Sequence, residues 1–287
     1  SSDVCSSDLT AGTNIIDAGA DNDTITATGG NNTIDSGAGL NTLSLNGGTN
    51  SVTGGAAADN ITTTSGTNVI NAGGGVDTIN LNGGVNTVNA QAGADIITAT
   101  LGQNVIDSGD DADVITLSGG ANTVQSSTGA DIITATDGTN TIDAGDGLNT
   151  LTLSGGTNSV TSGADADHIT TTSGVNVIYA GDGADVIHLN GGVNTVYAEA
   201  GVDSITVTLG DNAIDAGDGD DLITLSGGFN TVQGNSGVDS ITATGGTNVM
   251  DGGADDDILT LTDGSNSVKG GSGDDHITAT SGDNTID

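Results

Sequence analysis

The chain has 287 residues and no Pro or Trp, and its 38 Asp and Glu residues against one Lys or Arg give a formal net charge of −37. This charge argues against binding to nucleic acid or to anionic membrane surfaces, and no apolar run is long enough to cross a bilayer. Hydrophobic residues still make up 33% of the chain, mainly as evenly spaced Val, Ile, Leu and Ala. Because a disordered acidic chain lacks such regular β-branched content, the composition predicts a folded protein.

Residues 1–11 are predicted to be a leader and entry segment that does not belong to the rest of the chain. The first nine residues read SSDVCSSDL and resemble a translated sequencing adapter, so we expect Cys5, the only cysteine, not to be native. With one cysteine, no disulfide framework is possible. The chain has no initiator Met and ends in mid-repeat at Asp287. These features predict a fragment of a longer protein, truncated at both ends.

Residues 12–287 are predicted to form a single repeat array. Units of 18 residues follow one another without insertion, as in Gly138–Gly155 (GTNTIDAGDGLNTLTLSG) and Gly210–Gly227 (GDNAIDAGDGDDLITLSG). Each unit consists of two related nonapeptides, the first built around Asn and the second around Asp. A longer period of six units is also present, since the segment that starts at Gly84 recurs at Gly192. Such periods are typical of solenoids.

A unit of 18 residues with two turn signals predicts one solenoid coil of two short strands and two tight turns. The predicted fold is an all-β, right-handed parallel β-solenoid, or β-roll, of about 15–16 such coils. Alternation along the strands places Ile187 and Leu189 inside and His188 outside. One inward column alternates large and small side chains, which lets neighbouring coils interdigitate. It begins Ala27, Leu45, Thr63, Leu81, Ala99, Leu117, Ala135, Leu153.

The two turns of each coil differ in the residue that precedes the strand. On one side this residue is always Asn, from Asn14 to Asn284 at intervals of 18. On the other side it is Asp except at Asn41 and Asn149. We call the two sides the Asn edge and the Asp edge. The Asp edge contains Asp23, Asp59, Asp77, Asp95, Asp113, Asp131, Asp167, Asp185, Asp203, Asp221, Asp239, Asp257 and Asp275.

This asymmetry predicts a cation on one edge. A stacked Asn column can satisfy its own hydrogen bonds, because an amide both donates and accepts. Ionised carboxylates only accept, and at a spacing of about 5 Å they repel one another by about 1 kcal/mol per pair in water and more near a protein surface. Hard oxygen ligands favour Ca²⁺. A purely structural alternative is that each Asp caps its own turn.

The segment Gly270–Ile277 (GGSGDDHI) is similar to the GGxGxDxU nonapeptide of RTX, or hemolysin-type, calcium-binding repeats. The resemblance implies Ca²⁺ between successive loops, held by Asp carboxylates and backbone carbonyls. It favours Asp257 and Asp275 as ligands, then Asp221 and Asp239, with the rest of the Asp edge behind them. Two departures predict calcium on the Asp edge only and with uneven occupancy. The Asn edge lacks Asp loops, and Gln91, Ser127, Glu199 and Asn235 replace the second loop glycine.

The predicted function is a calcium-binding structural repeat region of a large secreted or cell-surface bacterial protein, such as an adhesin, a stalk or a secretion module. No catalytic residues are predicted, and the expected partners are calcium ions, without nucleic acid or membrane insertion. One alternative is the repeat tail of an extracellular enzyme whose catalytic domain lies elsewhere. Another is an ice-binding solenoid, because outward Thr-x-Thr triplets such as Thr98–Thr100 and Thr134–Thr136 recur, although most coils between them are expected to interrupt the array. Tyr179 and Tyr197, one coil apart, are expected to stack on the surface, and a ligand platform there stays open.

Overall fold

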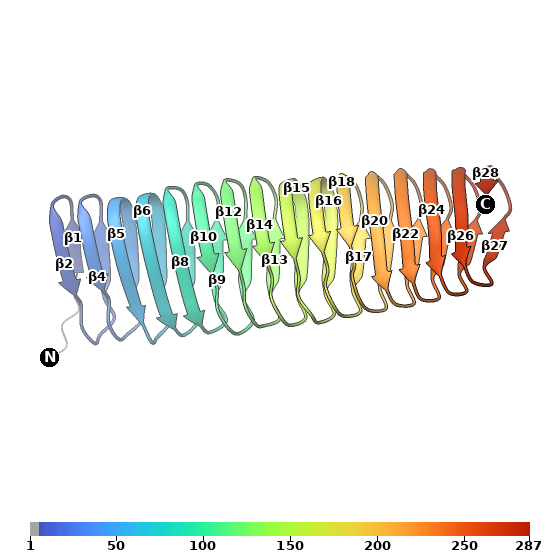
Figure 1. Cartoon of the computed structure of the whole chain (residues 1–287). Coiled ribbons are helices and arrows are strands. Elements are labelled where there is room, and N and C mark those ends of the chain that lie inside the picture. Colours follow the sequence, from blue (N-terminus) through green and yellow to red (C-terminus); the bar gives the residue numbers. More distant parts are fainter. Residues whose placement is uncertain (1–5) are drawn as a thin grey trace. The chain divides into compact units, whose positions relative to one another are not determined.

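The computed structural model describes residues 6–287, and Cys5 lies outside the described residues. The described chain contains β-strands and no helix, and it divides into two compact units, up to Gly145 and from Asp146 to Asp287. Within each unit, the strands of successive coils lie side by side (Figure 1). The predicted parallel β-solenoid of 18-residue coils is therefore confirmed. Residues 6–287 include no long apolar helix of the kind that spans a membrane.

The first unit contains the strands β1 to β14. They are β1 (Ser6–Leu9), β2 (Thr13–Asp17), β3 (Thr24–Ala27), β4 (Asn31–Asp35), β5 (Thr42–Gly55), β6 (Asn60–Gly74), β7 (Thr78–Leu81), β8 (Val85–Ala92), β9 (Ile96–Ala99), β10 (Gln103–Asp107), β11 (Val114–Leu117), β12 (Ala121–Gln125), β13 (Ile132–Ala135) and β14 (Thr139–Asp143). In β5 and β6 the strand continues through the Asn edge, so one strand covers both arms of the coil.

The second unit repeats this plan with the strands β15 to β28. They are β15 (Thr150–Thr161), β16 (His168–Tyr179), β17 (Val186–Leu189), β18 (Val193–Tyr197), β19 (Ser204–Val207), β20 (Asp211–Asp218), β21 (Leu222–Leu225), β22 (Phe229–Ser236), β23 (Ser240–Ala243), β24 (Thr247–Ala254), β25 (Ile258–Leu261), β26 (Ser265–Ser272), β27 (His276–Ala279) and β28 (Asp283–Ile286). β15 and β16 run through the Asn edge as β5 and β6 do.

The register is set by the repeat length. Each strand pairs in parallel with its equivalents one coil before and one coil after, so that Val105 lies opposite both Thr87 and Thr123. Tight turns at glycines allow the chain to return in 18 residues. Gly102 has a φ of +100°, and a Cβ on it would lie 2.4 Å from the carbonyl oxygen of Gly84 in the previous coil. Glycine is needed there both for the left-handed backbone and for the close stacking of coils.

The core is a thin layer between the two arms of each coil. The alternating inward column is buried as predicted, and Ala99, Leu117 and Ala135 on three successive coils have no exposed surface. Ile187 and Leu189 are also fully buried, with His188 between them on the outside. Because the arms face each other across this layer, each coil contributes only a few large apolar side chains.

The ladder of parallel strands includes part of the segment that the sequence sets aside as a leader. Ser6–Leu9 form β1, which pairs with Thr24–Ala27 of β3 in the register used by the other coils. Backbone pairing of this kind requires little from the side chains, because the hydrogen bonds join main-chain atoms. Whether residues 1–11 derive from an adapter stays a prediction.

Replacement of Leu117 by Ala should destabilise the first unit by about 2–5 kcal/mol, because it removes a fully buried side chain and leaves a cavity next to the small Ala99 and Ala135. Leu101→Ala is the matched control, since Leu101 is 60% exposed. Thermal unfolding followed by circular dichroism in Ca²⁺ measures both changes. Equal melting temperatures for the two variants would contradict the interdigitated core.

Candidate metal site

The Asn edge satisfies itself by side-chain hydrogen bonds from coil to coil, as predicted. Asn104 Nδ2 donates to Asn122 Oδ1 at 2.8 Å and to the Leu101 carbonyl oxygen at 3.3 Å. Asn104 Oδ1 in turn accepts a hydrogen bond from Asn86 Nδ2 at 2.7 Å. Both amide hydrogens and the carbonyl oxygen are used, so this edge needs no ion.

The Asp edge is built differently, by hydrogen bonds from backbone to side chain. The backbone N–H of Asp95 donates to Oδ1 of Asp113, and the N–H of Asp113 donates to Oδ1 of Asp131, both at 2.7 Å. The carboxylates are buried, and Asp113 has no exposed surface. At the end of the second unit, Asp275 is partly exposed and accepts from the N–H of Asp257 at 3.0 Å. All thirteen predicted Asp ligands therefore occupy one edge.

The second carboxylate oxygen on the Asp edge is buried without a hydrogen bond. This oxygen, Oδ2, is enclosed and has no hydrogen-bond partner among the described residues in ten coils: Asp59, Asp77, Asp95, Asp113, Asp167, Asp185, Asp203, Asp221, Asp239 and Asp257. A buried acceptor without a partner is costly, and more so when it carries charge. A whole column of them indicates that a positive group belongs beside these oxygens.

One coil of the Asp edge shows what lies opposite Oδ2. In the second unit the column begins with Asn149, whose Nδ2 donates to the carbonyl oxygen of Ser162 at 3.1 Å. Ser162 is the first loop residue of the next coil, the residue five positions before Asp167. Where Asp replaces Asn, an acceptor takes the place of this donor. A carboxylate oxygen then faces a carbonyl oxygen, and neither can donate.

The coils with glycine as the first loop residue place these two acceptors around one point. A Cβ atom on Gly234 would lie 2.1 Å from the Gly252 carbonyl oxygen and 2.2 Å from Asp239 Oδ2. A Cβ atom on Gly252 would lie 2.5 Å from the Gly270 carbonyl oxygen and 2.4 Å from Asp257 Oδ2. The absent side chain leaves room where both oxygens converge. Only a proton or a cation can sit between two acceptors favourably.

Burial raises the pKa of the Asp-edge carboxyls. Removal from water is the largest cause at every one of them, and the hydrogen bond from the previous coil's backbone N–H opposes it. The pKa is raised to about 7 at Asp95, Asp185 and Asp221. It is raised to about 6 at Asp77, Asp113, Asp131, Asp167, Asp203 and Asp239. These carboxyls hold protons unusually well when no cation is beside them.

The donor set fits a hard cation. Within residues 6–287, no group of three or more His, Cys, Asp or Glu side chains is close enough to hold a metal ion by itself, so carbonyl oxygens would have to complete the coordination. The first-loop-residue carbonyls converge with Oδ2 and suit this role. The second-residue carbonyls are engaged in stacking the loops, as where Asp218 N–H donates to Glu199 O at 2.7 Å. Carboxylate and carbonyl oxygens are the ligands of Ca²⁺.

The non-glycine residues in the loops keep the turn conformation of glycine. Gln91, Ser127, Glu199 and Asn235 at the second loop position have φ values of 79°, 65°, 76° and 77°. The replacements on which the prediction of uneven occupancy rests therefore do not change the local backbone. The feature that the sequence analysis missed is the first loop residue, which is Gly at 54, 234, 252 and 270 and Ala or Ser in most other coils. The first glycine of the GGxGxD pattern is the signal that marks it.

The RTX calcium-binding nonapeptide repeat family matches this chain in successive segments that together span residues 9–287. Since the match covers nearly all of the sequence, the chain belongs to this family of calcium-binding repeat proteins. The predicted resemblance is thereby confirmed. Which of the thirteen Asp residues hold an ion stays a prediction.

A solved structure with a similar fold is the crystal structure of a hyperactive, Ca²⁺-dependent, β-helical antifreeze protein from an Antarctic bacterium. The two chains share 21% sequence identity with a TM-score of 0.50, and the match covers 99% of this chain and 83% of that one. At this identity the likeness shows a common fold. No curated protein matches the sequence.

Without Ca²⁺, the protein should become more stable as the pH falls from 8 to about 5. The folded-state pKa of the buried carboxyls, about 6 to 7, lies above the model value of 3.8. Protonation therefore favours the folded state, and this stability is lost as the pH rises through 6 to 7. Melting temperatures in EGTA across this range test the prediction, and a melting temperature that is highest at pH 8 would contradict it.

Asp113→Asn should have opposite effects with and without calcium. In EGTA at pH 7.5 it should raise the melting temperature, because the new amide can donate to the Ser126 carbonyl as Asn149 does to Ser162. In Ca²⁺ it should lower the melting temperature, because a ligand is lost. Asp137→Asn removes the same charge from an exposed position on the Asn edge and serves as the control.

Proposed function

We propose that Ca²⁺ ions bound along the Asp edge cross-link successive coils, and that the array is a structural module that folds where calcium is abundant. The observation that supports the proposal most directly is the column of buried Oδ2 atoms without hydrogen bonds, which face carbonyl oxygens of the next coil. A divalent cation supplies positive charge to both acceptors at once. The family of this chain is defined by calcium-binding repeats.

The chain's own residues prepare the sites in three ways. Backbone N–H groups fix Oδ1 of each Asp and so aim Oδ2. The left-handed turns bring the first-loop-residue carbonyl of the next coil beside it. Burial excludes water and strengthens the attraction between ion and carboxylate. The sites with Gly as the first loop residue, at Asp59, Asp239, Asp257 and Asp275, have the most room and are proposed to fill first.

The energetics favour folding outside the cell. A ligand that binds only the folded state adds RT ln(1 + [L]/Kd) per site. For weak sites at millimolar Ca²⁺ this is about 1–3 kcal/mol each, so several sites together equal the stability of a domain. In a calcium-poor cytosol the charge of −37 opposes stacking of the coils. A chain that stays loose until it is exported suits secretion.

We therefore place the module in a secreted or cell-surface bacterial protein, as an adhesin segment, a stalk or a secretion-assisting repeat, with no catalytic role of its own. A repeat tail on an extracellular enzyme uses the same physics and is the alternative within this proposal. In both cases the partners proposed for the array itself are calcium ions.

Removal of Ca²⁺ by EGTA at pH 7.5 should strongly reduce the β-sheet circular dichroism signal or lower the melting temperature by tens of degrees. Asp239→Asn with Asp257→Asn should reduce the number of ions bound, as measured by calorimetry, and lower the melting temperature in Ca²⁺. The charge-matched control is Asp211→Asn with Asp283→Asn, two exposed positions on the opposite arm. Identical spectra and melting points in Ca²⁺ and EGTA would rule out calcium as part of the fold.

Ice binding is a second candidate, which one feature of the second unit favours. Thr206, Thr224, Thr242, Thr260 and Thr278 lie in register on five successive coils. A parallel column two residues further along the strands contains Thr208, Ser226, Thr244, Thr262 and Thr280. In this stretch the Thr array is continuous, and the expectation that most intervening coils interrupt it is too strong. Evenly spaced hydroxyls on a rigid sheet offer the regular match that an ice surface requires.

If this candidate is correct, the protein in Ca²⁺ should shape growing ice crystals into facets, and Thr242→Tyr with Thr260→Tyr should abolish the effect by breaking the flat column. Video microscopy of single crystals measures this. Rounded growth at high concentration of the unmodified protein would remove ice binding from consideration.

A further inference from the structure

The aromatic residues of this chain are gathered on one face of the second unit. The sequence contains two Tyr, one Phe and no Trp. Tyr179 in β16, Tyr197 in β18 and Phe229 in β22 all point outward, with exposed fractions of 38%, 37% and 66%. The two tyrosine rings are stacked, with centroids 4.9 Å apart and planes inclined by 10°, as predicted. A protein with so few aromatic residues places all of them within four coils.

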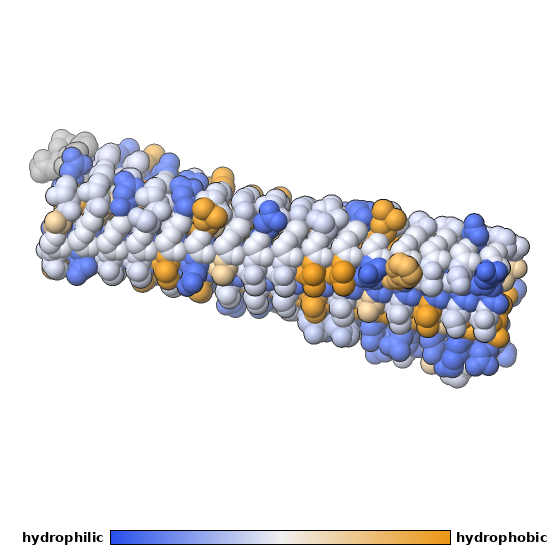
Figure 2. Space-filling model, turned by 90° about the horizontal axis from the view of Figure 1, so that it is seen from above, coloured by the Kyte–Doolittle hydropathy of each residue, from blue (hydrophilic) through white to orange (hydrophobic). Residues whose placement is uncertain are grey.

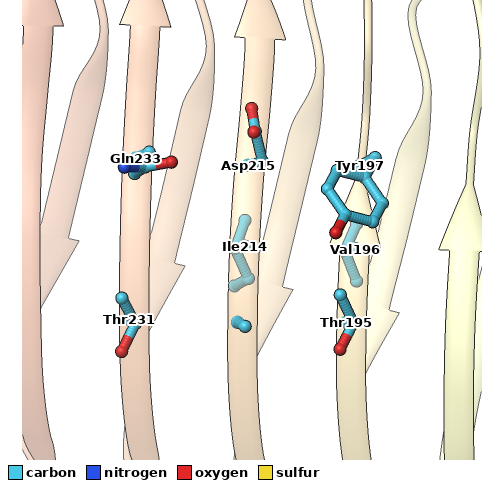
Figure 3. A pocket seen from close by; sticks show the side chains of 8 residues that line it. Thr195, Val196, Tyr197, Ile214, Asp215, Thr231 and Gln233 are labelled. Carbon is cyan, nitrogen blue, oxygen red and sulfur yellow. The ribbon is translucent and has the colours of Figure 1, made fainter.

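A hollow of about 220 Å³ lies beside this stack. In Figure 3, Tyr197, Asp215 and Gln233 lie in one row across three neighbouring strands, and Thr195 and Thr231 lie in the next row. Between the two threonines the middle strand carries Ala213, whose small side chain leaves the space open. The hollow therefore has an aromatic wall, an aliphatic floor and a rim of polar groups.

The polar rim is held in place by its neighbours. Asp215 Oδ1 accepts a hydrogen bond from Asn235 Nδ2, which fixes the carboxylate next to the hollow. The backbone beneath is a regular parallel ladder, in which Asp215 pairs with both Tyr197 and Gln233. Groups on such a rigid sheet lose little freedom when a ligand binds, which favours binding.

The same scaffold occurs six coils earlier without the aromatic groups. Asp107 and Gln125 stand at the positions of Asp215 and Gln233, so the polar groups are retained. However, Asn71, Asn89 and Ala121 replace Tyr179, Tyr197 and Phe229, and Val105 replaces Ala213. The second copy of the duplicated block thus differs by gaining three exposed aromatic side chains and losing the side chain that would fill the hollow. Neither change improves the core, because all of these positions face outward.

We propose that this hollow is a binding site for one neutral pyranose ring of a glycan. The face of a pyranose carries C–H groups that pack on an aromatic ring, and its rim carries hydroxyl groups. Tyr197 offers the ring face, while Asp215, Gln233 and the two threonines offer acceptors and donors. The volume lies below the roughly 300–1,000 Å³ of pockets for drug-sized ligands, so it suits a single ring. The net charge of −37 disfavours acidic sugars.

Intrinsic tyrosine fluorescence tests the proposal, because both tyrosines of the chain lie at the site and no tryptophan masks them. The folded protein in Ca²⁺ is titrated with cellohexaose, laminarihexaose, maltohexaose, mannohexaose and chitohexaose, each up to about 10 mM, which covers the weak end of specific binding. Saturation-transfer NMR on the same mixtures reports contact with the sugar protons. We expect at least one of these neutral oligosaccharides to change the fluorescence with saturation.

Two variants probe the site without disturbing the fold. Ala213→Val fills the hollow with the residue that the earlier copy carries as Val105, and it should weaken sugar binding about tenfold or more while both tyrosines remain. Tyr197→Ala should abolish the transfer signal. Gln125→Ala, at the equivalent place in the first unit, should leave the affinity unchanged. Asn89→Tyr with Val105→Ala should create a second site, seen as doubled stoichiometry by calorimetry.

The proposal is overturned if none of the five sugars binds, or if binding survives unchanged in both Ala213→Val and Tyr197→Ala. It is also overturned if the tyrosine face instead joins two copies of the chain. In that case sedimentation would show self-association that Tyr197→Ala abolishes, and the sugars would have no effect. Neither result bears on the calcium edge, which is assayed separately.

Discussion

The structure depends on one juxtaposition that recurs along the Asp edge. The backbone of one coil fixes a carboxylate so that its second oxygen faces a carbonyl oxygen of the next coil, inside a turn that water does not reach. In water this arrangement would cost little, but burial makes two facing acceptors unfavourable. The raised pKa of the column has the same origin, since a proton is one way to relieve the conflict. A cation is the other way, and it joins the coils while it does so.

The two edges show how a small chemical difference separates a self-sufficient structure from a conditional one. Asn and Asp are nearly the same size, and both stack at intervals of 18 residues. The amide closes its own ladder, as Asn104 does with its two neighbours, at any calcium concentration. The carboxylate leaves the same ladder open. The solenoid thus has one edge that always holds and one edge whose stability is set by the surroundings.

Much of this arrangement could be predicted from the sequence, because in a solenoid of constant coil length the sequence period is also the spatial register. The Asn and Asp columns and the alternating Leu and Ala core follow directly from counting by 18. Relations between different positions of neighbouring coils are harder to predict. The pairing of Asp239 with the Gly252 carbonyl depends on how a side chain leans across the gap between coils. The continuous Thr column was missed for a related reason, since triplets along a strand draw attention away from neighbours across strands.

The side-chain ladders also give each unit a direction. Every Asn amide in the column donates toward the next coil and accepts from the previous one, and every Asp-edge N–H also donates toward the next coil. The amide dipoles within a unit therefore align instead of cancelling. A coil offers acceptors on one side and donors on the other, so only head-to-tail stacking joins complementary surfaces. Lengthening such an array by duplicating whole coils preserves this polarity at every junction, whereas inverting a block would bring donor against donor and acceptor against acceptor.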